Sequence, residues 1–238
     1  MRVTLAQTSP KLNRSNLDDI VTIIQDVKAD SDLIVFPELA LSGYLLQDKL
    51  REDAWSEEEL SLLAELSRDI DIAVGVAMRE GELFRNCGLY FSGGKLVAKH
   101  IKVHLPNYGM FEEARYFEGG EKFEAFEVAD KNISLLVCED LWHKEVHHEL
   151  ICLNPDLIIV HVASPARGFS EDGLEIREKW YEIISTVAKE CSAKLLFVNR
   201  VGFEDGLGFW GGSCVVDENG IIQSKLPKFE VKIETVNI

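Results

Sequence analysis

Runs of apolar residues, each bounded by polar turns, divide the chain into alternating strands and helices. Apolar positions at helical spacing predict helices that start near Ser15, near Ser56 and near Glu171, and the last of these runs to Cys191. Short runs that are apolar on both faces predict strands that are covered on both sides. The predicted strands cover residues 3–7, 33–36, 72–78, 87–91, 96–99, 133–137, 157–162, 194–198 and 213–216. This alternation predicts an α/β layered fold, and periodicity leaves open whether the strands form one sheet or two.

Two short segments carry local structural signals. The segment Ser15–Asp18 matches a capping box, in which side chains at both ends cap the first turn of a helix. Ser92-Gly93-Gly94-Lys95 joins two predicted strands and has the glycine pair of a tight hairpin turn. No linker, repeat or low-complexity stretch interrupts the pattern, so we predict a single domain over residues 1–238.

The composition is that of a globular protein. Hydrophobic residues make up 46% of the 238 residues and charged residues 28%, which is an ordinary profile. The formal net charge of -16 argues against nucleic acid or an anionic membrane as a partner, because both require basic patches. An anionic substrate is still compatible with this charge, because a cation inside a cleft can outweigh distant, screened surface charge.

The start of the chain and its cysteines predict a cytoplasmic protein. Residues 1–7 become polar too soon for a secretory signal, and no apolar run approaches the ~18 residues of a membrane span. The cysteines are odd in number and lack a CxxC pair, which predicts free thiols in a reducing compartment. They are Cys87, Cys138, Cys152, Cys191 and Cys214.

Three apolar runs each lead to a residue with a reactive side chain, namely Glu38, Lys102 and Cys138. A side chain at the end of a strand can face a cleft, so these runs could bring together a base, a cation and a nucleophile. A carboxyl group removed from water holds a proton more readily, which suits Glu38 to general acid–base work. A buried lysine at 102 would require a carboxylate partner.

Cys138 is the candidate nucleophile. A thiol attacks a carbonyl carbon as the thiolate, and its pKa falls beside a cation or at a helix N-terminus. We expect both at Cys138, with a helix that begins near Glu139 and runs to Leu150, whose free N–H groups could also receive an oxyanion. Each residue also has an interpretation without a catalytic role. Cys138 could be a core cysteine, Glu38 a capping or surface glutamate, and Lys102 an exposed lysine.

Together, these segments resemble the motif blocks of the nitrilase, or carbon-nitrogen hydrolase, superfamily. A fourth segment, Asn199–Asp205 followed by Phe209–Ser213, is similar to a further stretch of the same superfamily. The blocks follow the order and separation of the family and span nearly the whole chain. The three main blocks are Phe36–Glu38 with Gly43-Tyr44, Lys102–Pro106 with Asn107–Gly109, and Val137–Trp142.

The resemblance implies a role for each matched residue. Glu38 would be the general base, Lys102 would stabilise the tetrahedral intermediate and Cys138 would be the nucleophile. Lys102 would share the oxyanion site with the backbone N–H of Glu139.

The resemblance also implies features beyond these blocks. A second glutamate near the nucleophile is common in the superfamily, and we predict Glu113 for it, with Glu112 as the alternative. The implied fold is a four-layer α-β-β-α sandwich that assembles into a homodimer or a higher homo-oligomer. The implied chemistry needs no cofactor and no metal.

Within the superfamily, the Cys138 block and residues 107–117 are most similar to the glutaminase domain of glutamine-dependent NAD synthetases. Arg167-Gly168-Phe169 departs from the glycine-then-basic order of that domain, and the synthetase half is missing from this sequence. The resemblance therefore raises a separate, ammonia-using synthetase as a possible partner. The residues predicted to bind the amide substrate are Tyr44, Tyr108, Phe111, Glu139 and Ser164.

The predicted reaction is hydrolysis of a small linear amide through a cysteine thioester, with an N-carbamoyl compound or a nitrile as alternative substrates. A metal-dependent hydrolase is a second alternative, because His143 and His147 are one helical turn apart near Glu139 and Asp140. The segment does not match HExxH, and a solvated helix face is the simpler interpretation. A third alternative is a non-catalytic assembly subunit with the same fold.

Overall fold

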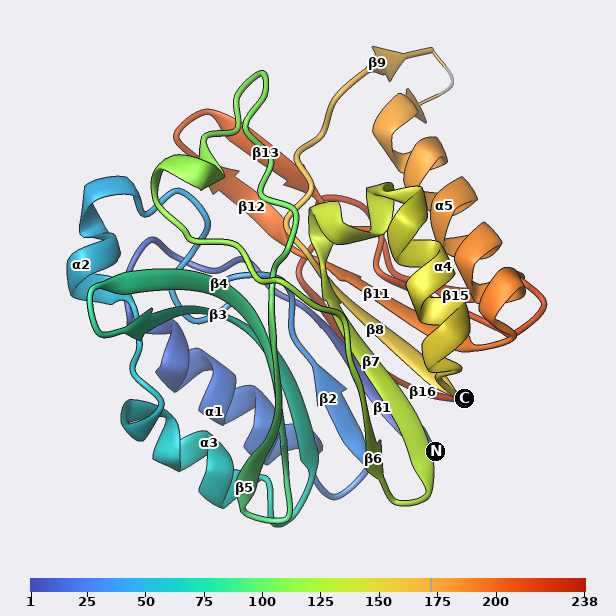
Figure 1. The fold of residues 1–238 in the computed structure, drawn as a ribbon, viewed down its shortest axis with the longest axis horizontal. Helices are drawn as coiled ribbons and strands as arrows, with labels where there is room; N and C mark the ends of the chain where they lie inside the picture. Colours follow the sequence, from blue (N-terminus) through green and yellow to red (C-terminus); the bar gives the residue numbers. More distant parts are fainter. Residues whose placement is uncertain (172) are drawn as a thin grey trace.

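The computed structural model describes residues 1–171 and 173–238, and most of its strands belong to two six-stranded sheets (Figure 1). The strands of the first sheet are β1 (Arg2–Gln7), β2 (Leu33–Val35), β3 (Asp71–Glu80), β4 (Leu83–Ser92), β5 (Lys95–Ile101) and β16 (Lys232–Asn237). Their order is β16-β1-β2-β3-β4-β5. The pairs β1–β2 and β2–β3 are parallel, and the remaining pairs are antiparallel.

The second sheet has the order β15-β14-β11-β8-β7-β6, with a parallel centre formed by β7, β8 and β11. Its strands are β6 (Ala125–Val128), β7 (Lys131–Val137), β8 (Leu157–Val162), β11 (Lys194–Asn199), β14 (Cys214–Val216) and β15 (Ile222–Lys225). Two short hairpins complete the strands: β9 (Phe169–Ser170) with β10 (Gly173–Leu174), and β12 (Val201–Glu204) with β13 (Leu207–Trp210).

Helices cover the outer face of each sheet, as Figure 1 shows for α1 and α3 on the first sheet and for α4 and α5 on the second. The α-helices are α1 (Asn16–Val27), α2 (Leu50–Asp53), α3 (Ser61–Leu66), α4 (Lys144–Leu153) and α5 (Glu175–Cys191). The 3₁₀ turns are η1 (Gln47–Lys49), η2 (Glu58–Leu60), η3 (Glu113–Arg115) and η4 (Cys138–Trp142). No helix in residues 1–171 and 173–238 is both long enough and apolar enough to cross a membrane.

The alternation of side chains along the strands explains the layers. On β2, Leu33 and Val35 join the core between the two sheets, while Ile34 points to the core under α1 and α3. On β8, Leu157 and Ile159 join the same central core, and Ile158 and Val160 point to α4 and α5. The centre of each sheet is therefore buried on both faces, which is why β2 and most of β8 are apolar without alternation. The predicted four-layer α-β-β-α sandwich is confirmed.

Several local predictions need correction. The predicted capping box at Ser15 is wrong, because Ser15 Oγ donates to Asn13 Oδ1 and the side chain of Asn16 bonds the preceding loop instead. The single helix predicted from Glu139 to Leu150 is two elements, η4 and α4, separated by His143.

The prediction for the long C-terminal helix holds except at its start. The helix predicted from Glu171 begins as α5 at Glu175, after the short strand β10, and it ends at Cys191 as expected. Residue 172 of the predicted helix lies outside the described residues.

The hairpin prediction is confirmed. Strands β4 and β5 pair across Ser92 and Lys95, so that Gly93 and Gly94 alone form the turn. Their φ angles are 59° and 87°, a region that glycine enters without steric cost. The pattern did not predict the edge strands β6, β15 and β16 or the β12–β13 hairpin, which are short or half exposed.

Candidate active site

The predicted reactive residues all follow strand ends and meet at one edge of the sandwich. Glu38 follows β2, Lys102 follows β5, and Cys138 follows β7. Because β7 and β8 are parallel, the segment after β8 that contains Ala163 reaches the same edge. Glu38 and Lys102 are fully buried, and Cys138 is partly exposed.

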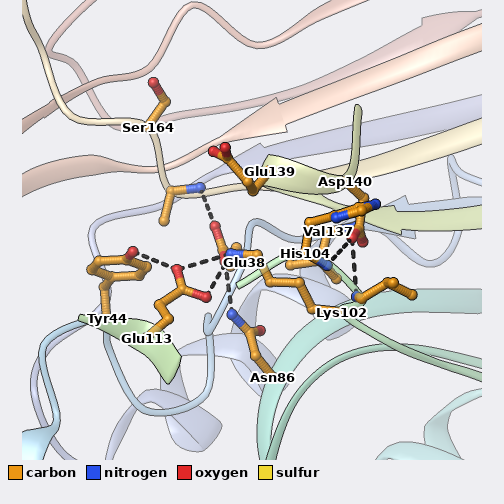
Figure 2. A network of polar contacts seen from close by, with 12 residues as sticks. Glu38, Tyr44, Asn86, Lys102, His104, Glu113, Val137, Glu139, Asp140 and Ser164 are labelled. Atoms are coloured by element: carbon orange, nitrogen blue, oxygen red, sulfur yellow. Dashed lines mark hydrogen bonds and ion pairs between the residues drawn. The ribbon is translucent and has the colours of Figure 1, made fainter. Parts of the chain in front are cut away.

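Glu38 and Lys102 form the centre of a network of polar contacts (Figure 2). Lys102 Nζ donates to Glu38 Oε1 over 2.7 Å, and Asn86 Nδ2 donates to the same oxygen over 2.8 Å. The other oxygen, Oε2, accepts the backbone N–H of Ala163 over 2.8 Å. Both oxygens of the buried carboxylate are therefore hydrogen-bonded and its position is held from three elements.

Glu113 is the second carboxylate of this network, and the geometry favours it over Glu112. Lys102 Nζ lies 2.8 Å from Glu113, and Tyr44 Oη donates to Glu113 Oε1 over 2.5 Å. Burial raises the pKa of Glu113 to about 7, with the charge of Glu38 acting in the same direction and Lys102 acting against it. Glu112 lies exposed on the surface and pairs with Arg115 instead.

The backbone of Cys138 is held in a sparsely populated conformation. Its φ angle is 44°, in the left-handed region that residues other than glycine rarely adopt. Cys138 is the first residue of η4, so the N–H of Glu139 has no partner within that turn. A reactive side chain on such a tight turn is presented to the cavity together with a free backbone donor.

The expected lowering of the Cys138 pKa is wrong for this structure. Desolvation raises the pKa of the thiol, and the charges of Glu38, Glu113 and Glu139 raise it further, while Lys102 acts in the opposite direction. The prediction considered one cation and a helix N-terminus, but the fold brings three carboxylates to the same thiol. This direction favours the neutral thiol, which must lose its proton before the sulfur can attack.

Asp140 links the turn that carries Cys138 to the segment that carries Lys102, a role that the sequence did not predict. Its Oδ1 accepts the N–H groups of Val103 and His104, and its Oδ2 accepts those of Val137 and His100 Nε2. Figure 2 shows Asp140 beside Val137 and His104. All four distances lie between 2.8 and 3.2 Å. Although burial acts to raise it, the pKa of Asp140 is lowered, because these hydrogen bonds favour the charged form.

The backbone around Glu38 also depends on a glycine in the neighbouring strand. A Cβ placed on Gly75 of β3 would lie 2.4 Å from Pro37 O and 2.5 Å from Glu38 Cα. Real Cβ contacts do not reach such distances, so only glycine lets β3 pass this close to the base. Together with Asn86, Gly75 is a supporting residue that sequence reasoning missed, and each sits on a buried strand that carries no motif of its own.

A narrow cavity of about 10 Å³ lies beside Cys138. Of the residues predicted to bind substrate, Tyr44, Phe111, Glu139 and Ser164 line it. Tyr108 is not among the lining residues; it is half exposed, and its hydroxyl donates to Glu139, which does line the cavity, over 2.9 Å. The volume holds about one water molecule, so an amide would enter as side chains at the rim move.

Ser164 lines this cavity, but its hydroxyl is already in use. Its Oγ accepts the indole N–H of Trp180 over 2.9 Å and that of Trp210 over 3.2 Å. Its backbone N–H donates to Asn199 Oδ1. The hydroxyl proton of Ser164 is the one donor that these contacts leave, so a role in substrate binding stays a prediction.

The histidines of the metal-hydrolase alternative lie differently from the prediction. His143 precedes α4, and His147 Nε2 donates to Leu141 O, so the pair does not share a helical face. Among the described residues, His104, His143 and Glu145 could bring ligand atoms within 4.8 Å of one another. The rings of His104 and His143 stack 3.7 Å apart and nearly parallel, so their in-plane lone pairs do not converge on one point. The geometry favours a stacked pair over a metal centre.

The fold described above is that of the carbon-nitrogen hydrolases. A family model described as "Carbon-nitrogen hydrolase" matches residues 2–238, and the chain belongs to this family. The chain is similar to the glutamine-dependent NAD(+) synthetase of Synechocystis, with 33% identity over 253 residues, 96% of this chain and 44% of the relative. A similar enzyme of Acinetobacter baylyi is 28% identical over 240 residues, 98% of this chain and 43% of the relative. The chain thus spans less than half of these relatives.

Solved structures give the same picture of the fold. A glutamine-dependent NAD+ synthetase from Acinetobacter baumannii superposes with a TM-score of 0.86 at 30% identity, and covers 98% of this chain and 44% of its own. A mutant of the Nesterenkonia AN1 amidase of the nitrilase superfamily superposes with a TM-score of 0.84 at 25% identity, and covers 100% of this chain and 90% of its own. Another structure of that amidase carries an acrylamide adduct at its active-site cysteine.

Proposed function

We propose that the chain hydrolyses the C–N bond of a small linear amide through a thioester on Cys138. The observation that carries this proposal is the convergence, at one edge of the sandwich, of a thiol that lines the cavity, a hydrogen-bonded buried carboxylate and a buried lysine. The amidase and glutaminase-containing relatives support the same reaction class.

In the first half of the reaction, Glu38 takes the proton of the Cys138 thiol, and the thiolate adds to the amide carbonyl. Lys102 and the backbone N–H of Glu139 stabilise the oxyanion, each donor contributing roughly 10² to 10³ in rate. The tetrahedral intermediate then collapses, the C–N bond breaks, and Glu38 returns its proton to the departing ammonia or amine. This sequence explains why the thiol can rest in its neutral form.

In the second half, Glu38 accepts a proton from water, which attacks the thioester carbonyl. The C–S bond breaks, the sulfur regains the proton and the carboxylic acid leaves. Glu113 assists as the second carboxylate that holds Lys102 and by accepting the hydroxyl of Tyr44. No step uses a cofactor.

The decisive test compares two cysteine variants on a panel of aliphatic amides, N-carbamoyl compounds and glutamine, with ammonia release as the readout. Cys138→Ala is expected to lower kcat by at least ~10⁴-fold. Cys152→Ala, which removes an exposed thiol on α4, is the matched control and should retain full activity. Near-wild-type turnover by Cys138→Ala would sink the proposal.

The non-catalytic assembly subunit is the main rival, and alkylation separates the two. Iodoacetamide should label the Cys152→Ala protein rapidly and with a stoichiometry of one, at Cys138, because the base beside it activates this thiol. The remaining cysteines are buried and should react slowly. Equally slow labelling of Cys138 would favour the assembly role.

The proposal extends to partners and location. Because those relatives are more than twice as long as this chain and are named as NAD synthetases, a separate synthetase that uses the released ammonia is a candidate partner. We further propose a homodimer or higher homo-oligomer in the cytoplasm, where the five free thiols would stay reduced. Faster hydrolysis of a short uncharged amide than of glutamine would remove the synthetase partner. Gel filtration with light scattering tests the oligomer.

A further inference from the structure

His161 is a fully buried histidine between the two sheets that the proposed reaction does not use. It lies on β8, on the same face as Leu157 and Ile159, and its Nδ1 is 2.7 Å from the carbonyl oxygen of Phe36. A carbonyl oxygen can only accept, so the ring proton is on Nδ1. Burial lowers the pKa of His161 to about 4, although the bond to Phe36 acts against this. The ring is therefore neutral at ordinary pH, and its one proton points at Phe36.

The carbonyl group of Phe36 is free for this contact because the ladder between β2 and β3 is irregular at Pro37. Phe36 N donates to Ala73 O, and a regular parallel ladder would continue with Gly75 N donating to Phe36 O. Gly75 N donates to Pro37 O instead. In residues 1–171 and 173–238 no backbone N–H donates to Phe36 O. A buried carbonyl without a partner is costly, so His161 supplies the hydrogen bond that the ladder omits.

This hydrogen bond is one of two that join the β8 segment to the end of β2, with the same spacing on both segments. Two residues beyond His161, the N–H of Ala163 donates to Glu38 Oε2 over 2.8 Å, and Glu38 is two residues beyond Phe36. Strands β2 and β8 belong to different sheets, so both bonds connect the two sheets (Figure 1). One bond holds the carboxylate of the base, and the other holds the backbone from which that carboxylate extends.

His161 also lies beside the strand that carries the nucleophile. Its register partner in β7 is Val137, the residue before Cys138. On the opposite sheet the ring packs against Gly88 of β4, where an added Cβ would lie 2.8 Å from its Cδ2 and 3.2 Å from its Nε2. A side chain at position 88 would displace the imidazole. Strands of both sheets therefore enclose the ring and hold it in one orientation.

We infer that His161 is a positioning residue that sets the distance from the Glu38 carboxylate to the Cys138 thiol. Its Nδ1–H holds the Phe36 carbonyl, and its ring keeps the end of β2 at a fixed distance from the end of β7. Glu38 takes and returns a proton in both halves of the proposed reaction, and a misplacement of about 1 Å can lower such a rate by about 10²-fold. This inference rests on the proposed function of the same site.

The test compares two substitutions by kcat and KM for the amide of the panel that the wild-type protein hydrolyses fastest. His161→Leu keeps an apolar side chain but removes the donor, and it should lower kcat by about 10- to 100-fold while KM changes by less than about 3-fold. His161→Asn carries Nδ2 as many bonds from Cα as Nδ1 is, so it can donate to Phe36 O and should keep kcat within about 5-fold of the wild type. A packing role alone predicts the opposite order, because leucine suits an apolar interior better than asparagine.

Tyr90→Phe is the matched control, because it also removes one hydrogen bond of a buried side chain in the core between the sheets. The hydroxyl of Tyr90 donates to Asp71 Oδ2 over 2.8 Å, and Asp71 begins β3 at the end away from Glu38. The control should lower the melting temperature and leave kcat and KM per folded molecule unchanged. Thermal melts of all three variants separate a loss of stability from a loss of positioning.

Nitrogen-15 NMR of histidine-labelled protein gives a readout that does not depend on activity. The resonances that disappear in His161→Leu should show a neutral ring with its proton on Nδ1 between about pH 5 and pH 8. A proton on Nε2 would overturn the inference, and so would an unchanged kcat in His161→Leu or an Asn variant no better than the Leu variant. If the wild-type protein hydrolyses no amide of the panel, the proposed function fails and the inference fails with it, which is a distinguishable result.

Discussion

The protein buries two ionic clusters, one around Lys102 and one around Arg200, and they differ in charge balance. In the first, a single lysine faces two carboxylates, Glu38 and Glu113. In the second, Arg200 faces Glu204 alone. The side chains of both clusters are almost fully withdrawn from water.

The second cluster is also saturated with backbone contacts. Arg200 donates to the carbonyl oxygens of Pro10 and Val201, and its guanidinium lies 4.2 Å from the centre of the Phe209 ring. Glu204 Oε2 accepts the N–H groups of Tyr44 and Leu45. Such a one-to-one cluster, whose charged groups are all hydrogen-bonded, can hold distant segments of the chain together.

The excess negative charge raises the pKa values of groups in and beside the first cluster. With two carboxylates for one cation, the pKa of Glu113 rises to about 7 and the pKa of Cys138 also rises. Protons can therefore move within this cluster near neutral pH. The comparison teaches that charge imbalance, rather than burial alone, separates a reactive ionic cluster from a structural one.

Glu38→Gln should give the largest effect, because it removes the base but preserves the shape of the side chain. We expect kcat to fall by about 10² to 10⁴-fold, while the melting temperature stays close to that of the wild type since Lys102 keeps Glu113. Steady-state ammonia release and thermal denaturation measure the two quantities. Retained activity would show that the unbalanced cluster is not the reactive one.

Arg200→Met should show the opposite behaviour. It leaves Glu204 charged and unpaired in the interior, and we expect a loss of about 3–5 kcal/mol in the free energy of unfolding. Urea denaturation measures this loss, and activity per folded molecule should remain within a few-fold of the wild type. A variant that keeps its stability would contradict the structural assignment of this cluster.

Asp140→Asn tests the link between the two reactive segments. Because the carboxylate accepts four N–H groups from the Cys138 turn, the Lys102 segment and His100, we expect kcat to fall by about 10- to 100-fold with little change in KM. A structural role alone would lower the melting temperature and leave kcat per folded molecule intact. Kinetics under conditions where the variant is fully folded distinguish the two.

Glu113→Gln should give the smallest effect on stability. The direction of the change in melting temperature tests whether the Lys102 cluster carries an excess of negative charge. The pKa of Glu113 is about 7 in the folded chain against an ordinary 4.5, so its ionisation costs folding free energy that is absent at low pH and complete above about pH 7. We expect the variant to melt higher than the wild type at about pH 8 and to lose that advantage toward about pH 5. The Cys138 thiol should also react with iodoacetamide at lower pH, because one raising charge is gone.

The residues that the sequence predicted are marked by local patterns, and those it missed are defined by contacts between distant segments. Glu38, Lys102 and Cys138 were predictable, because an apolar run that ends in an ionisable residue is a local pattern. Asp140 and Asn86 were not, because their partners come from strands that are distant in sequence and become neighbours only after pairing.

The fold shows the same division between local and long-range information. The Gly93-Gly94 turn and the buried strands follow from local composition, and the sandwich followed from family resemblance. Strand β16 was missed, because it is a half-exposed edge strand whose place is set by pairing with β1, more than 220 residues away. The pKa of Cys138 was misjudged for a related reason, since the three carboxylates that raise it lie 100, 25 and one residues from it in the chain.

Gly75 sets a constraint on how this protein can vary. A single added methyl group there would occupy the space of the Glu38 backbone, although β3 itself carries none of the reactive side chains. Substitution at this position would therefore disable the catalyst while every reactive residue remained in the sequence. A search for lost activity among natural variants of this chain should inspect position 75 as carefully as the residues that touch the substrate.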